Sequence, residues 1–241
     1  MQGWEYLLLW GSAVLGGILA LGVRSGKPHL VQLLLSFSGA YLLGIAIVHL
    51  LPEIFAKDLS YAGAWVLAGF VIQQLIEPIS HGIEHGHMHQ MHRSAVLPIM
   101  IGLSLHAFLE GLPLEGYAEM AHEGHRHYTG INHLLLGIVL HKAPAAFALV
   151  SLLRASGLPT WVNTLCLVIF ASTSPFAAWM AGQYMLQPAT LYPLMAVVTG
   201  SFLHLSTTIL FESGARGTHI ISWGKSAAIL LGFGFSVLTA M

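Results

Sequence analysis

Long apolar runs, separated by short polar breaks that contain glycine or proline, recur along the whole chain. A run of about 20 apolar residues is long enough to cross the ~30 Å hydrocarbon core of a bilayer as a helix. The pattern predicts eight such helices, near Trp4–Val23, Leu30–Leu51, Tyr61–Ile79, Ala95–Tyr117, His133–Arg154, Trp161–Leu186, Thr190–Glu212 and Ile220–Ala240. We therefore expect an all-α integral membrane fold, with a single transmembrane domain over 1–241 and a histidine-rich loop at 80–94.

The composition also favours a membrane protein. Hydrophobic residues make up 56% of the chain and charged residues 8%, and the net charge at pH 7 is -1. The mean hydropathy of +0.74 is high for a soluble domain. With so little charge the chain offers no basic surface to nucleic acid, and we expect the lipid bilayer to surround it.

Basic residues in the short loops predict the orientation of the helices, because Lys and Arg are retained on the cytoplasmic side of a membrane. With the N-terminus outside, the inner loops carry Arg24, Lys27, Arg93, Arg154 and Arg216, and the outer loops carry only Lys57 and Arg126. We therefore expect both termini outside, in a multi-pass protein of the cell membrane, which is the inner membrane if the cell is bacterial.

Two ionisable residues in the fourth predicted helix indicate chemistry at membrane depth. His106 and Glu110 are four residues apart in LSLHAFLEGLPLEG, so a helix places both side chains on one face, one turn apart. Imidazole nitrogen and carboxylate oxygen are ligands for Zn²⁺ and its first-row neighbours. A cysteine cluster is excluded, since Cys166 is the only cysteine. The alternative is a His–Glu pair that only joins two helices.

The fifth predicted helix, GIVLHKAPAAFALVSLL, adds His141 at similar depth. Pro144 in this helix and Pro113 in the fourth each remove a backbone hydrogen bond, a distortion that is tolerated where the backbone lines protein or water. Two neighbouring helices with a histidine and a proline at matching depth form two walls of one site. We therefore predict that His106, Glu110 and His141 bind one metal ion.

Further polar residues lie toward the ends of other predicted helices. His49 and Glu53, four apart in HLLPEIF, lie near the outer surface, where they are either a receiving site for metal or a solvated helix end. Glu77 in the third helix and His204 in the seventh would release the ion on the inner side. His204 is equally explained as a packing residue that hydrogen-bonds a neighbouring helix.

Two histidine tracts flank these helices. The inner tract, EPISHGIEHGHMHQMHR, supplies His81, His85, His87, His89 and His92, and the outer tract, MAHEGHRHYTG, supplies His122, His125 and His127. Such tracts bind metal weakly and hand it on, although a solvated loop is the alternative. Tracts at both mouths favour passage of a metal over a closed structural site.

The fourth and fifth helices, with HAFLEG followed by HKAPAAFALVSLL, resemble those of the ZIP (Zrt/Irt-like) metal-ion transporters, especially the branch with HKAPAAF in its fifth helix. GAYLLGIAIVHLLPE, GSFLHL and the histidine-rich loop extend the likeness over most of the chain. The resemblance implies an eight-helix bundle in which helices 1–3 and 6–8 form an inverted repeat around helices 4 and 5. It also implies a homodimer, and a primary transport site made of His106, Glu110 and His141.

The sequence departs from the commonest pattern of that family at three positions. Lys142 stands where an acid would supply a second metal site, Ala107 replaces a polar neighbour of the fourth-helix histidine, and Ala145 replaces a later acid. We hypothesise that Lys142 points at Glu110 across the helix pair, stands in for the second cation and keeps Glu110 ionised. The alternative is that Lys142 extends toward a helix end.

The patterns and the resemblance together predict a divalent-metal transporter that moves its ion from the outside or a lumen toward the cytosol. Zn²⁺ is the expected substrate, and the same ligands accept Fe²⁺, Mn²⁺ and Cd²⁺. No cofactor is expected. A metal receptor or sensor without turnover is the main alternative.

Two enzyme classes are disfavoured. The GKS at Gly224–Ser226 lacks the upstream glycine of a phosphate loop, because His219 occupies that position, so we expect no nucleotide. The HEGHR stretch lacks the second histidine of a zinc-hydrolase motif, since Arg126 stands there. A membrane-embedded zinc hydrolase is therefore the least favoured reading, and the chain is not expected to be an enzyme.

Overall fold

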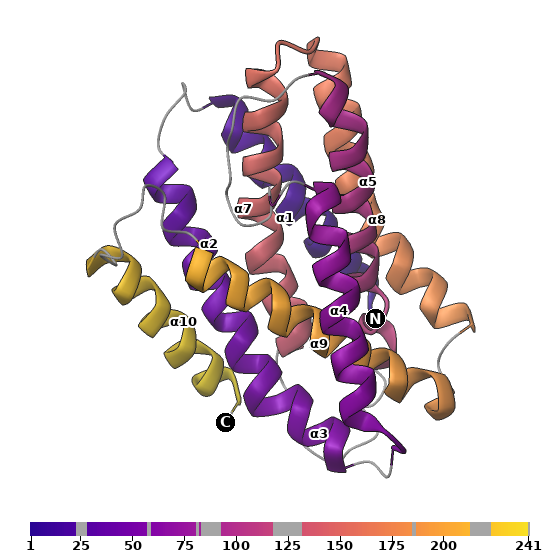
Figure 1. Cartoon of the computed structure of the whole chain (residues 1–241). Helices are drawn as coiled ribbons and strands as arrows, with labels where there is room; N and C mark the ends of the chain where they lie inside the picture. The colour runs from indigo at the N-terminus through magenta and orange to yellow at the C-terminus, as the bar shows by residue number, and fades with distance from the viewer. Residues whose placement is uncertain are drawn as a thin grey trace.

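The computed structural model describes residues 1–22, 28–56, 59–80, 82, 93–117, 132–184, 187–212 and 223–240, and within these ranges the chain is all-α, as predicted (Figure 1). The helices are α1 (Gly3–Gly22), α2 (Pro28–Ile45), which continues through η1 (Ala46–Leu50) into α3 (Leu51–Ala56), α4 (Ala62–Ser80), α5 (Val96–Gly111), which follows η3 (Arg93–Ala95), α7 (His133–Ala155), α8 (Thr160–Tyr184), α9 (Pro188–Glu212) and α10 (Trp223–Ala240).

The distribution of side chains is that of a membrane protein. Among the described residues, seven helical segments are long and apolar enough to cross a bilayer, and α10 is a shorter apolar helix. Large apolar side chains face outward, such as Leu7 and Leu230, each 70% exposed, while the polar side chains of Gln73 and Lys142 are fully buried. Polar groups inside and apolar groups outside suit a bundle whose surface contacts lipid, so the chain is a multi-pass integral membrane protein.

The fourth predicted span is interrupted by Pro113. The helix α5 ends at Gly111 rather than at Tyr117, because proline has no N–H to donate to the preceding turn. A short further turn, in which the Tyr117 N–H donates to the Pro113 carbonyl at 2.8 Å, carries the chain onward. The broken helix therefore lies directly after Glu110, at the candidate site.

The second predicted span runs past its expected end at Leu51 as far as Ala56. The π-helical turn η1 ends at Leu50, two residues before Pro52, whose missing N–H leaves a carbonyl of the preceding turn without its usual partner. His49 lies within this wider turn.

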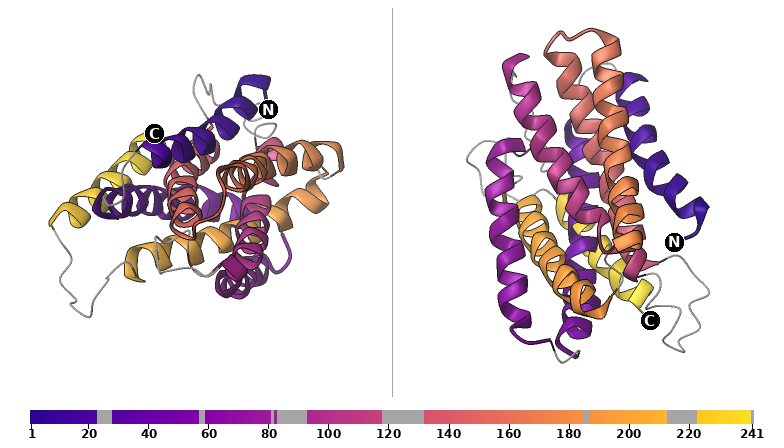
Figure 2. Two further views of the ribbon diagram at one scale, coloured as in Figure 1. Left: turned by 90° about the horizontal axis from the view of Figure 1, so that it is seen from above. Right: turned by 90° about the vertical axis from the view of Figure 1, so that its right-hand side faces the viewer.

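The pairing of helices follows an exchange symmetry. In chain order the eight spans are α1, the α2–η1–α3 segment, α4, α5, α7, α8, α9 and α10. The helix α1 packs on α7 and α8 packs on α5, while α2 packs on α10 and α9 packs on α4 (Figures 1 and 2). Suppose that spans 1–3 are exchanged with spans 6–8, and span 4 with span 5. The α1–α7 pair then becomes the α8–α5 pair, and the α2–α10 pair becomes the α9–α4 pair. This is the arrangement that an inverted repeat produces.

The helix α1 supports the central helix α7 from behind. Their backbones approach so closely that a Cβ atom on Gly16 would meet the backbone of Ala143. Small residues at a crossing permit such contact between membrane helices. Because Ala143 follows His141 and Lys142 directly, α1 fixes the part of α7 that carries these two side chains.

Two arginines bring several helix ends to the same side of the bundle. Nη1 of Arg154 donates to the carbonyls of Ala20 at 2.8 Å and Leu21 at 3.0 Å, at the end of α1. Nη2 of Arg93 donates to the Gly157 carbonyl at 2.9 Å, in the connection between α7 and α8. Both residues were expected to lie on one side of the membrane, and in the structure both lie at one end of the bundle.

Candidate metal site

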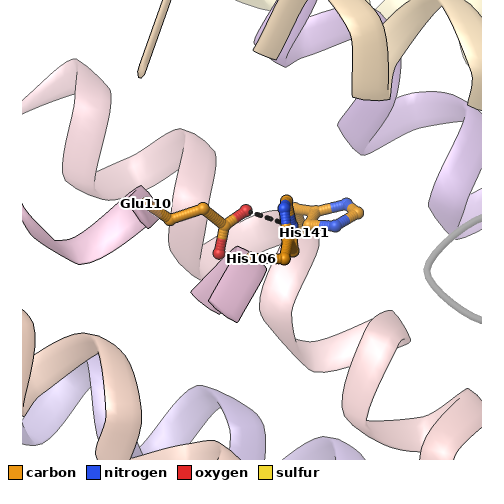
Figure 3. A group of neighbouring side chains, drawn as sticks. All are labelled: His106, Glu110 and His141. Atoms are coloured by element: carbon orange, nitrogen blue, oxygen red, sulfur yellow. Dashed lines mark ion pairs between the residues drawn. The ribbon is translucent and has the colours of Figure 1, made fainter. Parts of the chain in front are cut away.

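Three potential ligands meet in the interior of the bundle. His106 and Glu110 come from α5 and His141 comes from α7, and each side chain is at most 2% exposed. One ligand atom from each lies within 4.8 Å of the other two. Figure 3 shows the Glu110 carboxylate turned toward the two imidazole rings. In the described ranges this is the one group of three or more His, Cys, Asp or Glu residues whose ligand atoms converge.

The spacing of these atoms suits a single transition-metal ion. Nε2 of His106 lies 3.0 Å from Oε1 of Glu110, and the ring of His141 stands at 87° to that of His106 with 6.1 Å between centroids. Nitrogen and oxygen ligands bind Zn²⁺ at about 2.0–2.2 Å, so two ligand atoms on one ion lie roughly 3–3.5 Å apart. The pair on α5 already has this separation, and a small approach by His141 completes a three-residue ligand set.

Lys142 and His106 contact different oxygens of the Glu110 carboxylate. The Nζ atom of Lys142 is 3.8 Å from Oε2 of Glu110, and it donates to Oγ of Ser174 on α8. The same Nζ lies 4.7 Å from the centroid of the Phe170 ring, within range of a cation–π interaction. Because the side chain is 0% exposed, extension of Lys142 toward a helix end is ruled out.

The Ser174 hydroxyl connects three helices at this point. It accepts from Lys142 of α7 and donates to the Ala107 carbonyl of α5. Charged groups at membrane depth are stable only when paired in this way. The lysine is therefore held by a carboxylate, a hydroxyl and an aromatic face.

A glutamine on α4 contacts the second ring nitrogen of His106, the one that does not face Glu110. Oε1 of Gln73 lies 3.2 Å from Nδ1 of His106, and the Ser201 hydroxyl of α9 donates to the same oxygen at 3.0 Å. All three side chains are buried. The ring of His106 therefore has Gln73 at Nδ1 and Glu110 at Nε2.

The residues predicted at the outer mouth acquire a partner that the sequence did not suggest. His49, in the π-helical turn, stacks on His133 at the start of α7, with ring centroids 5.2 Å apart and an angle of 18° between the rings. Glu53 lies one turn further along, in α3. His133 follows Asn132, whose side chain caps α7 by accepting from the backbone N–H of Leu134 at 2.9 Å.

The residues predicted on the release side form a close pair. Nε2 of His204 on α9 lies 2.6 Å from Oε2 of Glu77 on α4, and the Phe70 ring meets the His204 ring edge-on at 4.9 Å. Glu77 is one turn from Gln73, and His204 is about one turn from Ser201. Two polar contacts between α4 and α9 therefore follow one another, beginning beside the candidate metal site.

Both histidine tracts lie outside the described residues. This applies to the inner tract of His81, His85, His87, His89 and His92 and to the outer tract of His122, His125 and His127. Their proposed handling of metal stays a prediction from the sequence.

Four residues around the site were not given roles by the sequence alone: His133, Gln73, Ser174 and Ser201. Their signal was only that each is polar within an apolar helix. Each contacts a residue from a different helix, and the pairing of helices is not encoded in local spacing.

The fold and the buried cluster define a class of protein, namely multi-pass helical membrane proteins that hold ionisable ligands at membrane depth. The curated proteins to which the chain is similar include three zinc transporters. The chain is 30% identical over 179 residues to the zinc transporter ZIP9 of Micropogonias undulatus. This match covers 68% of the present chain and 55% of that protein. The chain is 27% identical over 175 residues to zinc transporter ZIP9-B of Xenopus laevis and to zinc transporter ZIP9 of Xenopus tropicalis, covering 66% of this chain and 54% of each.

The chain spans about half the length of the curated relatives that it matches. No family model matches the chain. The likeness to these relatives and the all-helical membrane bundle nevertheless agree, and both support the resemblance to the ZIP family.

Proposed function

We propose that the protein, acting as a single transmembrane domain, carries a divalent metal ion through a site between α5 and α7 to the cytosol. The observation that carries this proposal is the convergence of His106, Glu110 and His141 in the interior of the bundle. A charged side chain at the centre of a bilayer costs about 2.5–3.5 kcal/mol or more, and such residues mark ion pathways.

Zinc is the proposed substrate. The relatives are zinc transporters by name, and imidazole with carboxylate suits Zn²⁺. Fe²⁺, Mn²⁺ and Cd²⁺ are compatible with the same ligand types. The metal is cargo rather than a cofactor, and no reaction on a covalent substrate is proposed, so the protein is not an enzyme in this account.

The charges around the site favour an ion that leaves as readily as it arrives. Glu110 is the only carboxylate in the three-residue set, and Lys142 lies 3.8 Å from it. A divalent ion bound there would share its one anionic ligand with a buried ammonium. Transport requires binding that is weak enough for release, whereas a structural zinc site uses four tight ligands.

The remaining predicted residues supply a route. His49, stacked on His133, and Glu53 would receive the ion at the outer mouth, and Glu77 with His204 would release it toward the inner histidine tract. The shared location of Arg93 and Arg154 supports an orientation with both termini outside. A homodimer remains an expectation from the family resemblance.

Zinc uptake into proteoliposomes separates a transporter from a sensor. Purified wild-type protein would be reconstituted with a zinc-sensitive dye trapped inside, and total bound zinc would be measured on the same preparation. A transporter gives saturable accumulation of zinc inside the vesicles that reaches many ions per protein chain. Binding of about one ion per chain with no accumulation would instead identify a receptor or sensor.

A further inference from the structure

Gln73 contacts the ligand residue His106 but is not itself part of the proposed ligand set. Gln73 is on α4 and is 0% exposed, and its Oε1 atom lies 3.2 Å from Nδ1 of His106. A glutamine fully buried in a membrane bundle is costly unless its amide has a defined partner. The burial of Gln73 beside His106 therefore needs an explanation.

The amide oxygen can only accept a hydrogen bond, so the contact keeps a proton on Nδ1 of His106. The Ser201 hydroxyl donates to this same oxygen at 3.0 Å, so the oxygen accepts from two buried neighbours. Oε1 of Glu110, which also can only accept, lies 3.0 Å from Nε2, so without metal this nitrogen donates to the carboxylate. A bound ion would replace that proton on Nε2, while Nδ1 keeps its own. An outer hydrogen bond that fixes the tautomer and orientation of a ligand histidine is a general feature of metal sites.

The helices that hold this contact are in close register. A Cβ atom on Gly69 of α4 would meet the carbonyl oxygen of Val197 of α9, and one on Gly200 of α9 would meet that of Val66 of α4. These reciprocal close approaches leave α4 and α9 little freedom to slide past one another. Gln73 lies one turn from Gly69, and Ser201 lies one residue from Gly200. The contact between Gln73 and Ser201 is therefore fixed in place.

We propose that Gln73 is a positioning residue for the metal site: held by Ser201, it fixes His106 as an Nδ1-protonated imidazole whose Nε2 faces the ion. This inference rests on the proposed function for its consequence, tighter metal binding, but not for the tautomer itself. It also links the site on α5 to the α4–α9 pair that carries Glu77 and His204.

The tautomer is tested on metal-free protein by ¹⁵N NMR of labelled histidine, with the His106 signals assigned by their loss in His106→Ala. Wild type and Gln73→Glu are expected to show a protonated Nδ1, because both side chains accept from it. Gln73→Leu is expected to lower the protonated fraction of Nδ1. The proposal is overturned if Gln73→Leu leaves this signal as it is in the wild type, whatever the protein transports.

The consequence is tested by Zn²⁺ affinity in detergent. Loss of an outer partner of a ligand histidine weakens binding by about 10- to 100-fold, and we expect this for Gln73→Leu. Gln73→Glu should restore affinity to near the wild-type value, and Gln74→Leu, the same change on the exposed neighbouring residue, should leave it unchanged. The double variant Gln73→Leu/His106→Ala should bind no more weakly than His106→Ala, since Gln73 acts through that ring.

The outcomes separate this inference from the proposed function. If wild type binds no Zn²⁺, the metal site fails while the NMR result still decides the role of Gln73. If wild type binds Zn²⁺ but Gln73→Glu is as weak as Gln73→Leu, or the two losses simply add, Gln73 is a packing residue and the proposal is wrong.

Discussion

Nζ of Lys142 lies 3.8 Å from Oε2 of Glu110, while Oε1 of the same carboxylate lies 3.0 Å from Nε2 of His106. The two oxygens of Glu110 are thus divided between a fixed cation on one side and the candidate ion position on the other. A buried carboxylate without a partner is strongly unfavourable, so the ammonium stabilises the bundle when no metal is bound. This geometry is what the hypothesis of a second-cation substitute requires.

Replacing Lys142 with an acid should create a second ion site. We expect Lys142→Glu to raise the zinc content from about one to about two ions per chain, because two facing carboxylates attract a cation where the ammonium stood. Metal analysis of purified protein after gel filtration measures this. Lys225→Glu changes the same residue type in α10 and is the control. A content that stays at one ion in Lys142→Glu would refute the role given to Lys142.

The close approach of α1 to α7 should be sensitive to side-chain size. Gly16→Leu forces α1 away from Ala143, because a Cβ atom already meets the backbone there, whereas Gly11→Leu on the same helix adds its side chain to open space. Overpacking typically costs about 1–3 kcal/mol. We expect a clearly lower thermal unfolding temperature and weaker zinc binding for Gly16→Leu only, measured by tryptophan fluorescence and dye competition. Equal effects from both variants would show that α1 does not support the site.

The contact between Glu77 and His204 should matter for release rather than for binding. Glu77→Gln is expected to reduce uptake by about tenfold or more, since the carboxylate that receives the ion is lost. The affinity of the central site should change little, because Glu77 is a turn away from Gln73 and pairs with His204. Initial uptake rates and equilibrium binding on one preparation test this, with Gln74→Ala as control. Loss of binding together with uptake would place Glu77 in the central site instead.

The proposed orientation can be measured directly with introduced cysteines. In a Cys166→Ala background, Gln187→Cys lies after α8 and Thr160→Cys lies at its start, so the two occupy opposite ends of one span. We expect a membrane-impermeant maleimide applied to intact cells to label the first and not the second. Labelling of the second alone would reverse the orientation and with it the direction assigned to the route.

The positions of the helices followed from the sequence because each apolar run has the length of a bilayer span. The pairing of His106 with Glu110 also followed, since four residues make one helical turn. Convergence with His141 was predicted from matching depth and from the family resemblance, and the structure brings the three together.

Contacts that depend on how helices rotate against one another were not predictable. His49 was matched with Glu53, its neighbour in sequence, whereas the structure also stacks it on His133 from another helix. The roles of Ser174 and Gln73 were missed for the same reason. Local periodicity tells which residues share a face, but which face meets which neighbour is decided by packing of the whole bundle.

The central claim is that metal crosses the membrane through the ligands of α5 and α7. The most direct test is the initial rate of Zn²⁺ uptake into proteoliposomes for wild type, Glu110→Gln and His141→Ala, beside Asn163→Ala, which alters a buried polar residue of α8 away from the cluster. The account predicts saturable uptake in wild type and Asn163→Ala, and a loss of at least about tenfold in both site variants although they fold. Uptake at the wild-type rate in Glu110→Gln or His141→Ala would contradict it.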